Sequence, residues 1–379
     1  MEKITLWQGV EKRYIETDSG RLYLPDFSKT PDVIGKYLRK QMLNKNRKVI
    51  FLFDSISYLM FKKHFRQKID ISNLDMYNSN FPPNTYNVYP SIFFGVQISK
   101  HKIPGTAFYN GEGLLNLMSN KVYKLDGNKL TIKKAPWDSA LTPFPYYSKN
   151  AFLTIVPDKK WLQTQFWKRM FYSKSLLSVK RVGSLDEYDY SSEFLLLMNA
   201  VSRAIKNTKY NIITYIDFDE IMHMFGVEKA NTQKLINLVA DLISNIVEHN
   251  EQIDYFFVSD HGHISQKSVH NAELLPISKT FYCADGGAGR TRYFYTKSPE
   301  AFEYIRDLVG NTGVVVHRGN RILNRLYGFE TKEFYRIGDI VAIATKPNFP
   351  SHGWNFVGEH GGTSIEEYSI PFLHLTKRT

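Results

Sequence analysis

Residues 49–54 of the chain read VIFLFD, an unbroken apolar run that ends in an acid. A continuous run of β-branched and aromatic residues is typical of a parallel strand that is covered on both faces. The segment Ile212–Ile216 (IITYI) repeats the pattern and stops at Asp217. Tyr255–Ser259 (YFFVS) repeats it again and stops at Asp260. These three segments predict strands of a mostly parallel sheet.

Helical patterns alternate with these apolar runs. Thr232–Val247 and Glu193–Ile205 place their apolar residues at the 3-4 spacing of an amphipathic helix. Gly313–Val316 and Ile340–Ala344 are further candidate strands. Because strands and helices alternate, the sequence predicts a three-layer α/β/α sandwich with a mostly parallel central sheet.

We expect a single domain over residues 1–379, without internal repeats or long linkers. Two stretches, 107–192 and 264–350, separate the main motifs. We expect both stretches to be cap or insert segments that shape a substrate pocket.

The composition is that of a basic globular protein. Hydrophobic residues make up 43% and charged residues 23%, so a large core can form. The formal net charge of +12 favours anionic partners, although the basic runs carry no nucleic-acid motif. No run approaches the roughly 18 apolar residues of a membrane span, and the N-terminal residues lack a signal-peptide core. We therefore expect a cytoplasmic protein, and the sequence leaves its oligomeric state open.

The single cysteine, Cys283, excludes an intramolecular disulfide and a metal site built from several thiolates. Acids and histidines are the remaining candidate ligands. Asp219 and His223 are four residues apart, so they can share one side of a helical turn. Asp260 and His261 follow a predicted buried strand on a glycine-containing turn. Each pair is also compatible with an ordinary ion pair or hydrogen bond.

Two more positions complete this set. His360 lies in a glycine-flanked loop before Tyr368–Leu375, a predicted final strand, and either binds a metal or hydrogen-bonds to the backbone. Asp54 either caps a helix at Tyr58–Phe65 or faces a metal. Three carboxylates and three imidazoles suit two divalent cations about 4 Å apart, with open positions for phosphate oxygens.

Four motifs occur in the chain order of a known superfamily: VIFLFD (49–54), DFDEIMHMFG (217–226), VSDHGH (258–263) and GEHGGTSIEEYSIP (358–371). With these motifs the chain resembles the alkaline phosphatase superfamily. It is most similar to the type I phosphodiesterase/nucleotide pyrophosphatase branch and to PglZ-like proteins. The resemblance implies a phosphoester hydrolase that uses two divalent cations, usually zinc, with manganese or magnesium in some branches.

The resemblance also implies two ligand sets: Asp54, Asp260 and His261 for one cation, and Asp219, His223 and His360 for the other. It leaves His263 out, because the family often has methionine at this position.

The segment expected to carry the nucleophile departs from the family pattern, Pro-Ser/Thr-x-Thr. Pro90 and the stretch from His101 match, but the usual threonine falls on Phe93, which has no oxygen. Ser91 is the nearest hydroxyl and is the predicted nucleophile, with Thr106 as the poorer choice. A hydroxyl beside a cation can attack phosphorus and form a covalent intermediate. The alternative interpretation of Ser91 is a turn serine after proline.

Arg290 and Arg292 follow the glycine-rich turn DGGAG (285–289). Guanidinium groups bind phosphate oxygens in pairs, so both residues are candidate substrate-binding residues. The alternative is a hairpin turn with solvated arginines.

Three functions are compatible with these patterns. The first is a metal-dependent phosphodiesterase or nucleotide pyrophosphatase/phosphatase that acts on an anionic phosphoester or nucleotide. Phe93 motivates the second, a degenerate member that binds such a ligand without cleaving it. The basic charge and the PglZ-like ending motivate the third, a nuclease-like or defence-associated protein.

Overall fold

The computed structural model describes residues 2–7, 9–126, 129–134, 152–157, 164–171, 175–178, 190–266, 285–350 and 356–376. A seven-stranded sheet in the order β11-β10-β12-β4-β13-β20-β5 forms its centre. Its strands are β4 (Arg47–Asp54), β5 (Asp75–Asn78), β10 (Phe152–Val156), β11 (Ser175–Ser178), β12 (Asn211–Asp217), β13 (Ile253–Ser259) and β20 (Ser369–Thr376). The five neighbours from β11 to β13 run parallel, and β20 is antiparallel to β13.

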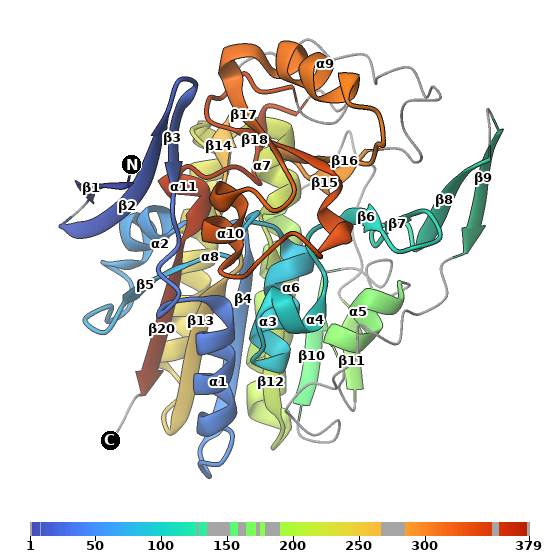
Figure 1. Ribbon diagram of the computed structural model, residues 1–379. Helices are drawn as coiled ribbons and strands as arrows, with labels where there is room; N and C mark the ends of the chain where they lie inside the picture. The colour runs from blue at the N-terminus through green and yellow to red at the C-terminus, as the bar shows by residue number, and fades with distance from the viewer. Residues whose placement is uncertain are drawn as a thin grey trace.

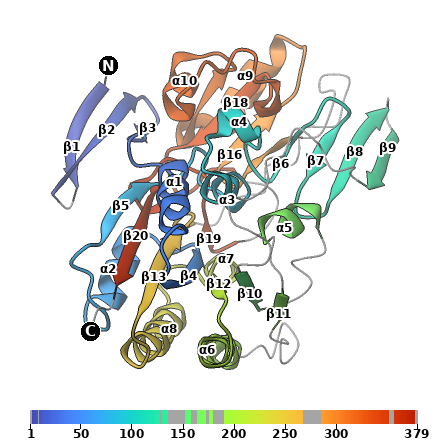
Figure 2. The same cartoon turned by 90° about the horizontal axis from the view of Figure 1, so that it is seen from below.

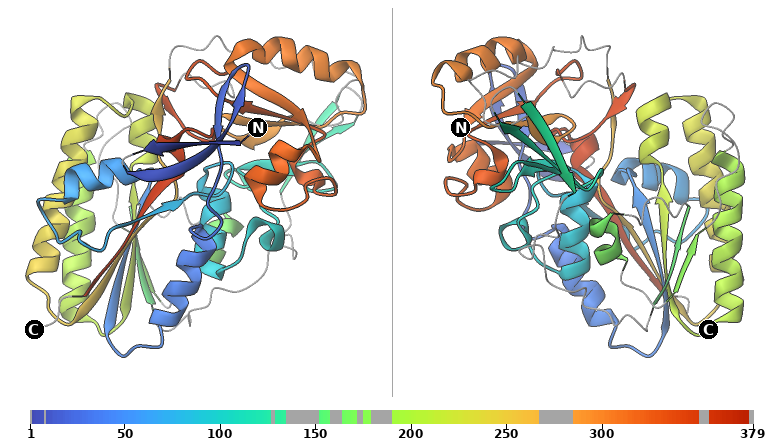
Figure 3. Two further views of the ribbon diagram at one scale, coloured as in Figure 1. Left: turned by 60° about the vertical axis from the view of Figure 1, so that its left-hand side comes forward. Right: turned by 90° about the vertical axis from the view of Figure 1, so that its right-hand side faces the viewer.

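Helices cover both faces of this sheet, as Figures 1 and 2 show. One face carries α2 (Tyr58–Phe65), α6 (Tyr190–Asn207) and α8 (Ala230–Glu248). The other carries α1 (Pro31–Gln41), α3 (Thr85–Phe94) and α5 (Gln165–Met170). The right-hand view of Figure 3 shows the sheet between the two layers. The predicted α/β/α sandwich with a mostly parallel central sheet is therefore confirmed.

The two layers explain the unbroken apolar run of β4. Val49, Phe51 and Phe53 belong to the core under α6 and α8. Ile50 and Leu52 belong to the core under α1 and α3. Since successive side chains of a strand point to opposite faces, a strand between two helical layers needs apolar residues at every position.

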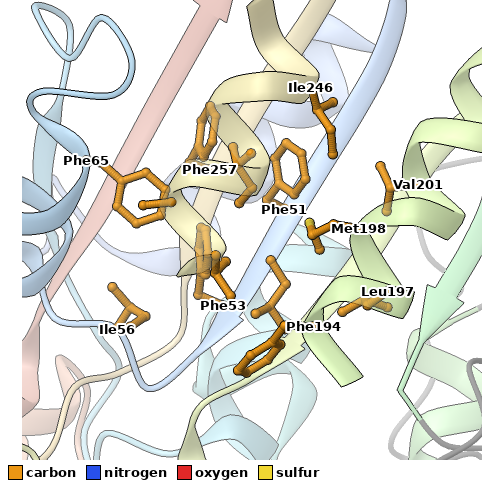
Figure 4. Close-up of a cluster of buried hydrophobic side chains, with 14 of the residues drawn as sticks. Phe51, Phe53, Ile56, Phe65, Phe194, Leu197, Met198, Val201, Ile246 and Phe257 are labelled. Atoms are coloured by element: carbon orange, nitrogen blue, oxygen red, sulfur yellow. The ribbon is translucent and has the colours of Figure 1, made fainter. Parts of the chain in front are cut away.

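Phe51 lies in the middle of the larger core, where its ring stacks on Phe257 with centroids 5.2 Å apart (Figure 4). We expect Phe51→Ala to lower the free energy of unfolding by about 3–5 kcal/mol, because it leaves a cavity that the neighbours cannot fill. Urea unfolding measures this loss. Leu43→Ala is the control, since Leu43 is 85% exposed. Equal losses in the two variants would contradict the described packing.

A second sheet has eight antiparallel strands in the order β17-β18-β16-β15-β6-β7-β8-β9. They are β6 (Ala107–Tyr109), β7 (Leu114–Asn116), β8 (Lys121–Asp126), β9 (Lys129–Lys134), β15 (Gly286–Ala288), β16 (Thr291–Phe294), β17 (Gly313–His317) and β18 (Ile340–Ala344). This sheet lies at the end of the central sheet where β12 passes into α7 (Asp219–Phe225) (Figure 1). The candidate strands at Gly313–Val316 and Ile340–Ala344 therefore exist, but in this antiparallel sheet.

The expected insert segments are divided differently in the structure. Within 107–192, β6 to β9 join the second sheet, whereas β10 and β11 extend the central sheet. The reason is that FLTIV (152–156) is a fully buried apolar strand, which pairs in parallel with β12. Strands β6 and β15 pair with each other, so both expected inserts contribute to one sheet. Parts of both segments, including Cys283, lie outside the described residues.

The remaining elements surround these two sheets. They are β1 (Glu2–Trp7), β2 (Val10–Thr17), β3 (Gly20–Tyr23), α4 (Ile98–His101), β14 (Ile264–Ser265), α9 (Glu300–Val309), α10 (Arg321–Tyr327), β19 (Gly358–Glu359) and α11 (Ile365–Tyr368), with 3₁₀ turns at Gly310–Thr312 and Tyr335–Ile337. Within the described ranges, every helix is too short or too polar to cross a membrane.

Candidate metal centre

Three neighbouring strands of the central sheet end at the candidate site. Asp54 at the end of β4 pairs with Asp217 at the end of β12, and β13 ends one residue before Asp260. Because the strands are parallel, their carboxyl ends meet at one edge of the sheet, where ligands of such folds bind. Asp54 is not a helix cap, since Ser57 caps α2 by accepting a hydrogen bond from the backbone N–H of Met60.

Asp54, Asp260 and His261 each offer a ligand atom, and these atoms lie within 4.8 Å of one another. His261 Nε2 is 3.4 Å from Asp54 Oδ1 and 3.5 Å from Asp260 Oδ2. Asp260 Oδ2 is buried and has no hydrogen-bond partner among the described residues. A buried carboxylate oxygen is normally paired, so this atom is available as a ligand for a cation.

The second predicted set, Asp219, His223 and His360, also lies together. The first turn of α7 brings His223 Nε2 to 3.3 Å from Asp219 Oδ2. His360 Nε2, from the loop before α11, is 3.6 Å from Asp219 Oδ1. The six residues predicted as ligands therefore converge at one edge of the sheet. That they bind two cations stays a prediction.

Two residues outside the predicted set join this cluster. His263 Nε2 is 2.7 Å from Asp219 Oδ1, and Glu359 Oε1 is 3.8 Å from His223 Nδ1. Each belongs to a group of possible ligand atoms within 4.8 Å. Both residues could have been found from their positions in the sequence. His263 is the last residue of the motif VSDHGH, and Glu359 directly precedes the predicted ligand His360.

Three histidines direct the same ring nitrogen into the cluster. Their Nδ1 atoms contact backbone carbonyl oxygens, with distances of 2.8 Å for His223 to Gly358, 3.2 Å for His261 to Gly262 and 2.8 Å for His360 to Pro83. A protonated Nδ1 donates to each carbonyl and leaves Nε2 with a lone pair that can bind a metal. The donor set therefore fits divalent cations that accept imidazole and carboxylate.

Burial and mutual repulsion act on the clustered carboxyls. The pKa of Asp54 is raised well above its usual value, because the group is buried and faces Asp260 and Asp219. Burial raises the pKa of Asp260 to about 7 and lowers the pKa of His261 to about 3. The protein itself thus supplies too little positive charge for these acids, and divalent cations would restore the balance.

The pKa of His223 is raised, in contrast to that of His261. Burial disfavours its charged form, but the carboxylates of Asp219 and Glu359 outweigh burial and raise its pKa to about 10. The imidazole and Asp219 thus form an ion pair when no metal is bound. A cation at this position competes with the proton, so metal binding releases it.

Ser91 does not lie in this cluster. Its buried hydroxyl is 2.9 Å from Asn80 Nδ2 and 3.1 Å from His101 Nε2. The N–H of Ile103 donates to His101 Nδ1, so Nε2 carries the proton and His101 cannot act as a base toward Ser91. The structure therefore places the predicted nucleophile, Ser91, in a buried hydrogen-bond network away from the clustered acids and histidines.

Thr85, the first residue of α3, places its hydroxyl at the cluster. Thr85 Oγ1 is 3.2 Å from His261 Nε2 and 3.4 Å from Asp54 Oδ1. The preceding Asn84 caps the helix by accepting a hydrogen bond from the N–H of Tyr86. The first N–H groups of a helix and its positive dipole end favour an anion, so a phosphate beside Thr85 is stabilised there.

The sequence held a signal for Thr85. FPPNT (81–85) ends in an N-cap asparagine followed by threonine, a typical helix start. The resemblance instead takes Pro90 as its landmark, and Pro90 lies inside α3. Ser91 is six residues after Thr85, so it lies about 9 Å further along the helix axis. At this distance Ser91 is away from the strand ends that carry the candidate ligands.

Arg290 and Arg292 have carboxylate partners. Arg290 Nε is 3.0 Å from Glu367 Oε1, and Arg292 Nη2 is 2.7 Å from Asp285 Oδ2. Both arginine side chains are buried. They form buried ion pairs with these carboxylates, so the alternative of solvated arginines is wrong, and the substrate-binding role stays a prediction.

We expect Arg290→Ala to lower the free energy of unfolding by about 3–5 kcal/mol, because Glu367 then keeps a buried charge with backbone N–H donors but without its cationic partner. Arg306→Ala is the control, since Arg306 and Glu303 form an ion pair between half-exposed side chains. Its expected loss is below about 1 kcal/mol. Denaturant unfolding compares the two, and a similar loss in both would contradict the structural role of Arg290.

Solved structures show the same fold. Murine ectonucleotide pyrophosphatase/phosphodiesterase 5 aligns with a TM-score of 0.57 and 13% identity, over 86% of this chain and 87% of that chain. An inactive threonine-to-alanine variant of that protein, in complex with AMP, aligns with a TM-score of 0.57 and 12% identity over the same shares. Phosphonoacetate hydrolase from Sinorhizobium meliloti 1021, in complex with phosphonoformate, aligns with a TM-score of 0.56 and 13% identity, over 100% and 94%.

Sequence comparison gives the family. No curated protein matches the chain in sequence. The sequence model of the family described as type I phosphodiesterase / nucleotide pyrophosphatase matches residues 61–367. That range includes every predicted ligand except Asp54. Because the match covers most of the chain, the protein belongs to the type I phosphodiesterase/nucleotide pyrophosphatase family.

Proposed function

We propose that the protein is a metal-dependent phosphoester hydrolase in which Thr85 is the nucleophile. The position of Thr85 Oγ1 carries this proposal, because it lies beside His261 Nε2 and Asp54 Oδ1 at the start of α3. A hydroxyl next to metal ligands and a helix N-terminus is placed to attack a bound phosphate. The net charge of +12 helps to attract such an anion.

The clustered residues fit two divalent cations. Asp54, Asp260 and His261 would hold one, and Asp219, His223 and His360 the other, with His263 and Glu359 as further candidate ligands. Imidazole nitrogens favour zinc over magnesium, while the carboxylates also suit manganese. Such cations, when bound, neutralise phosphate charge and lower the pKa of a nearby hydroxyl.

The chain's own groups then make and break the bonds. Thr85 Oγ1 gives up its hydroxyl proton and forms a bond to phosphorus while the bond from phosphorus to the ester oxygen breaks. The leaving alkoxide takes up a proton and departs as the alcohol, so the protons balance. Backbone N–H groups of α3 bind a phosphate oxygen. Water hydrolyses the phosphothreonine and restores the Thr85 hydroxyl. Asp219 and His223 are the more open side of the cluster, with side chains 20% and 11% exposed, and the substrate would enter there.

Phe93 motivated the alternative of a family member that binds without cleaving. Phe93 is a core residue of α3. Its ring centroid is 5.9 Å from that of Tyr89 and 5.9 Å from that of Phe171. The hydroxyl that Phe93 lacks is supplied by Thr85. The inactive threonine-to-alanine variant of the murine protein agrees with a threonine in this role. These observations favour a hydrolase over a binding protein.

In the test, the purified protein is loaded with Zn²⁺ or Mn²⁺ and incubated with each of three substrates: bis-p-nitrophenyl phosphate, p-nitrophenyl phosphate and ATP. Turnover of at least one ester, abolished by a chelator, is the expected result. Tight cation binding without turnover would favour the non-cleaving alternative. Salt-sensitive cleavage of single-stranded DNA, offered in parallel, would favour the nuclease-like alternative.

A further inference from the structure

Ser55 lies between the two ligand sets and is fully buried. Its Oγ is 2.8 Å from Asp219 Oδ1 and 3.2 Å from His261 Nδ1. Its backbone N–H donates to Asp260 Oδ1 over 3.1 Å. A single residue, directly after the ligand Asp54, therefore contacts candidate ligands of both cations.

The backbone of Ser55 is in the left-handed region, with φ of +75°. Residues with a Cβ atom are disfavoured there, whereas glycine adopts this conformation readily. Non-glycine residues in such conformations cluster at functional sites, where the surroundings hold them. Compared with glycine, serine adds one polar group at this position, and that hydroxyl points into the cluster.

The hydrogen bonds of Ser55 have a consistent direction. A serine hydroxyl donates one proton and accepts on its lone pairs. Asp219 Oδ1 is the nearest acceptor, so the Ser55 hydroxyl donates its hydrogen bond to this oxygen. When His261 binds a cation through Nε2, its Nδ1 is protonated and is shared between Ser55 Oγ and the carbonyl of Gly262. The bonds then run from His261 through Ser55 to Asp219, one ligand of each set.

The position of Ser55 differs from that of the proposed nucleophile. Thr85 Oγ1 faces His261 Nε2, the nitrogen available to a metal. Ser55 Oγ faces Nδ1 on the other side of the same ring. Ser55 thus contacts His261 through the ring nitrogen that does not face Thr85.

We infer that Ser55 is a positioning residue that couples the two cation sites, by holding His261 and Asp219 in fixed relative orientation. This inference rests on the proposed function, since it requires that the cluster binds cations. If the hydroxyl is removed, the affinity of both sites should fall, because one ligand of each site loses its support.

The experiment measures Zn²⁺ binding by isothermal titration calorimetry in full-length wild type, Ser55→Ala and Ser55→Gly, together with the melting temperature of each metal-free protein. Both variants lack the hydroxyl, so we expect both to bind roughly 10- to 100-fold more weakly at each of the two sites. Only Ser55→Gly relieves the left-handed strain, so its metal-free form should melt above that of Ser55→Ala.

Ser57→Ala is the matched control, because Ser57 caps α2 two residues further on. It is expected to lower the melting temperature while Zn²⁺ affinity stays at the wild-type value. Wild-type affinity in Ser55→Ala or Ser55→Gly, or a loss at one site alone, would overturn the coupling role and leave the proposed function standing. If the wild-type protein bound no cation, both the coupling role of Ser55 and the proposed function would be contradicted.

Discussion

Thr85→Ala is expected to reduce the turnover of a phosphoester by at least about 1,000-fold, since removal of a covalent nucleophile leaves only binding and electrostatic effects. Thr85→Ser keeps a hydroxyl beside His261 and Asp54 and should retain most of the turnover. Steady-state kcat with bis-p-nitrophenyl phosphate measures both variants. Binding of Zn²⁺ by Thr85→Ala should remain intact, which separates a lost nucleophile from a lost metal site.

Ser91→Ala is the informative control. Its turnover should stay within a few-fold of the wild type, because Ser91 contacts Asn80 and His101 and not the clustered ligands. Its stability should fall by about 1–3 kcal/mol, because those buried groups lose a partner. The reverse pattern, with turnover lost in Ser91→Ala and kept in Thr85→Ala, would contradict the assignment of Thr85.

Removal of divalent cations by a chelator is expected to abolish turnover and to lower the melting temperature of the wild type. A ligand that binds only the folded state stabilises it by about 2.7 kcal/mol at a free concentration 100 times its Kd. Thermal melts with and without Zn²⁺ measure the shift, and adding Zn²⁺ back should restore turnover.

His360→Ala is the matched variant for this experiment, since His360 belongs to two of the groups of possible ligand atoms. Its melting temperature should respond less to Zn²⁺ than that of the wild type. An unchanged response would mean that the stabilising cation binds outside the cluster.

Local patterns in the sequence were sufficient for the central sheet. VIFLFD, IITYI and YFFVS form β4, β12 and β13, because strands covered on both faces need apolar residues at every position. The two amphipathic segments form α6 and α8 within a few residues of the predicted bounds.

The second sheet could not be predicted in the same way. Its central pairing joins Ala107 to Gly287, far apart in the chain, through strands of only three residues each. Such short strands carry no periodicity, and register between distant segments is set by the packed fold. The division of these two segments between the two sheets could therefore not be predicted from the sequence.

The positions of Asp54, Asp260 and His261 were predictable because they end or directly follow apolar strands, and those of Asp219 and His223 because they are four residues apart on one helix. The ion pairs of Arg290 and Arg292 were not, since their partners Glu367 and Asp285 are set by tertiary structure. Ser55 was also missed, because a left-handed serine looks like any other serine in a sequence.

Anomalous X-ray diffraction at the zinc edge, from crystals grown with Zn²⁺, tests the central claim most directly. We predict two peaks per chain, within about 2.0–2.2 Å of ligand atoms. One should lie among Asp54, Asp260 and His261, and the other among Asp219, His223 and His360. The absence of any peak at this edge of the sheet, in crystals that hold zinc elsewhere, would contradict the account.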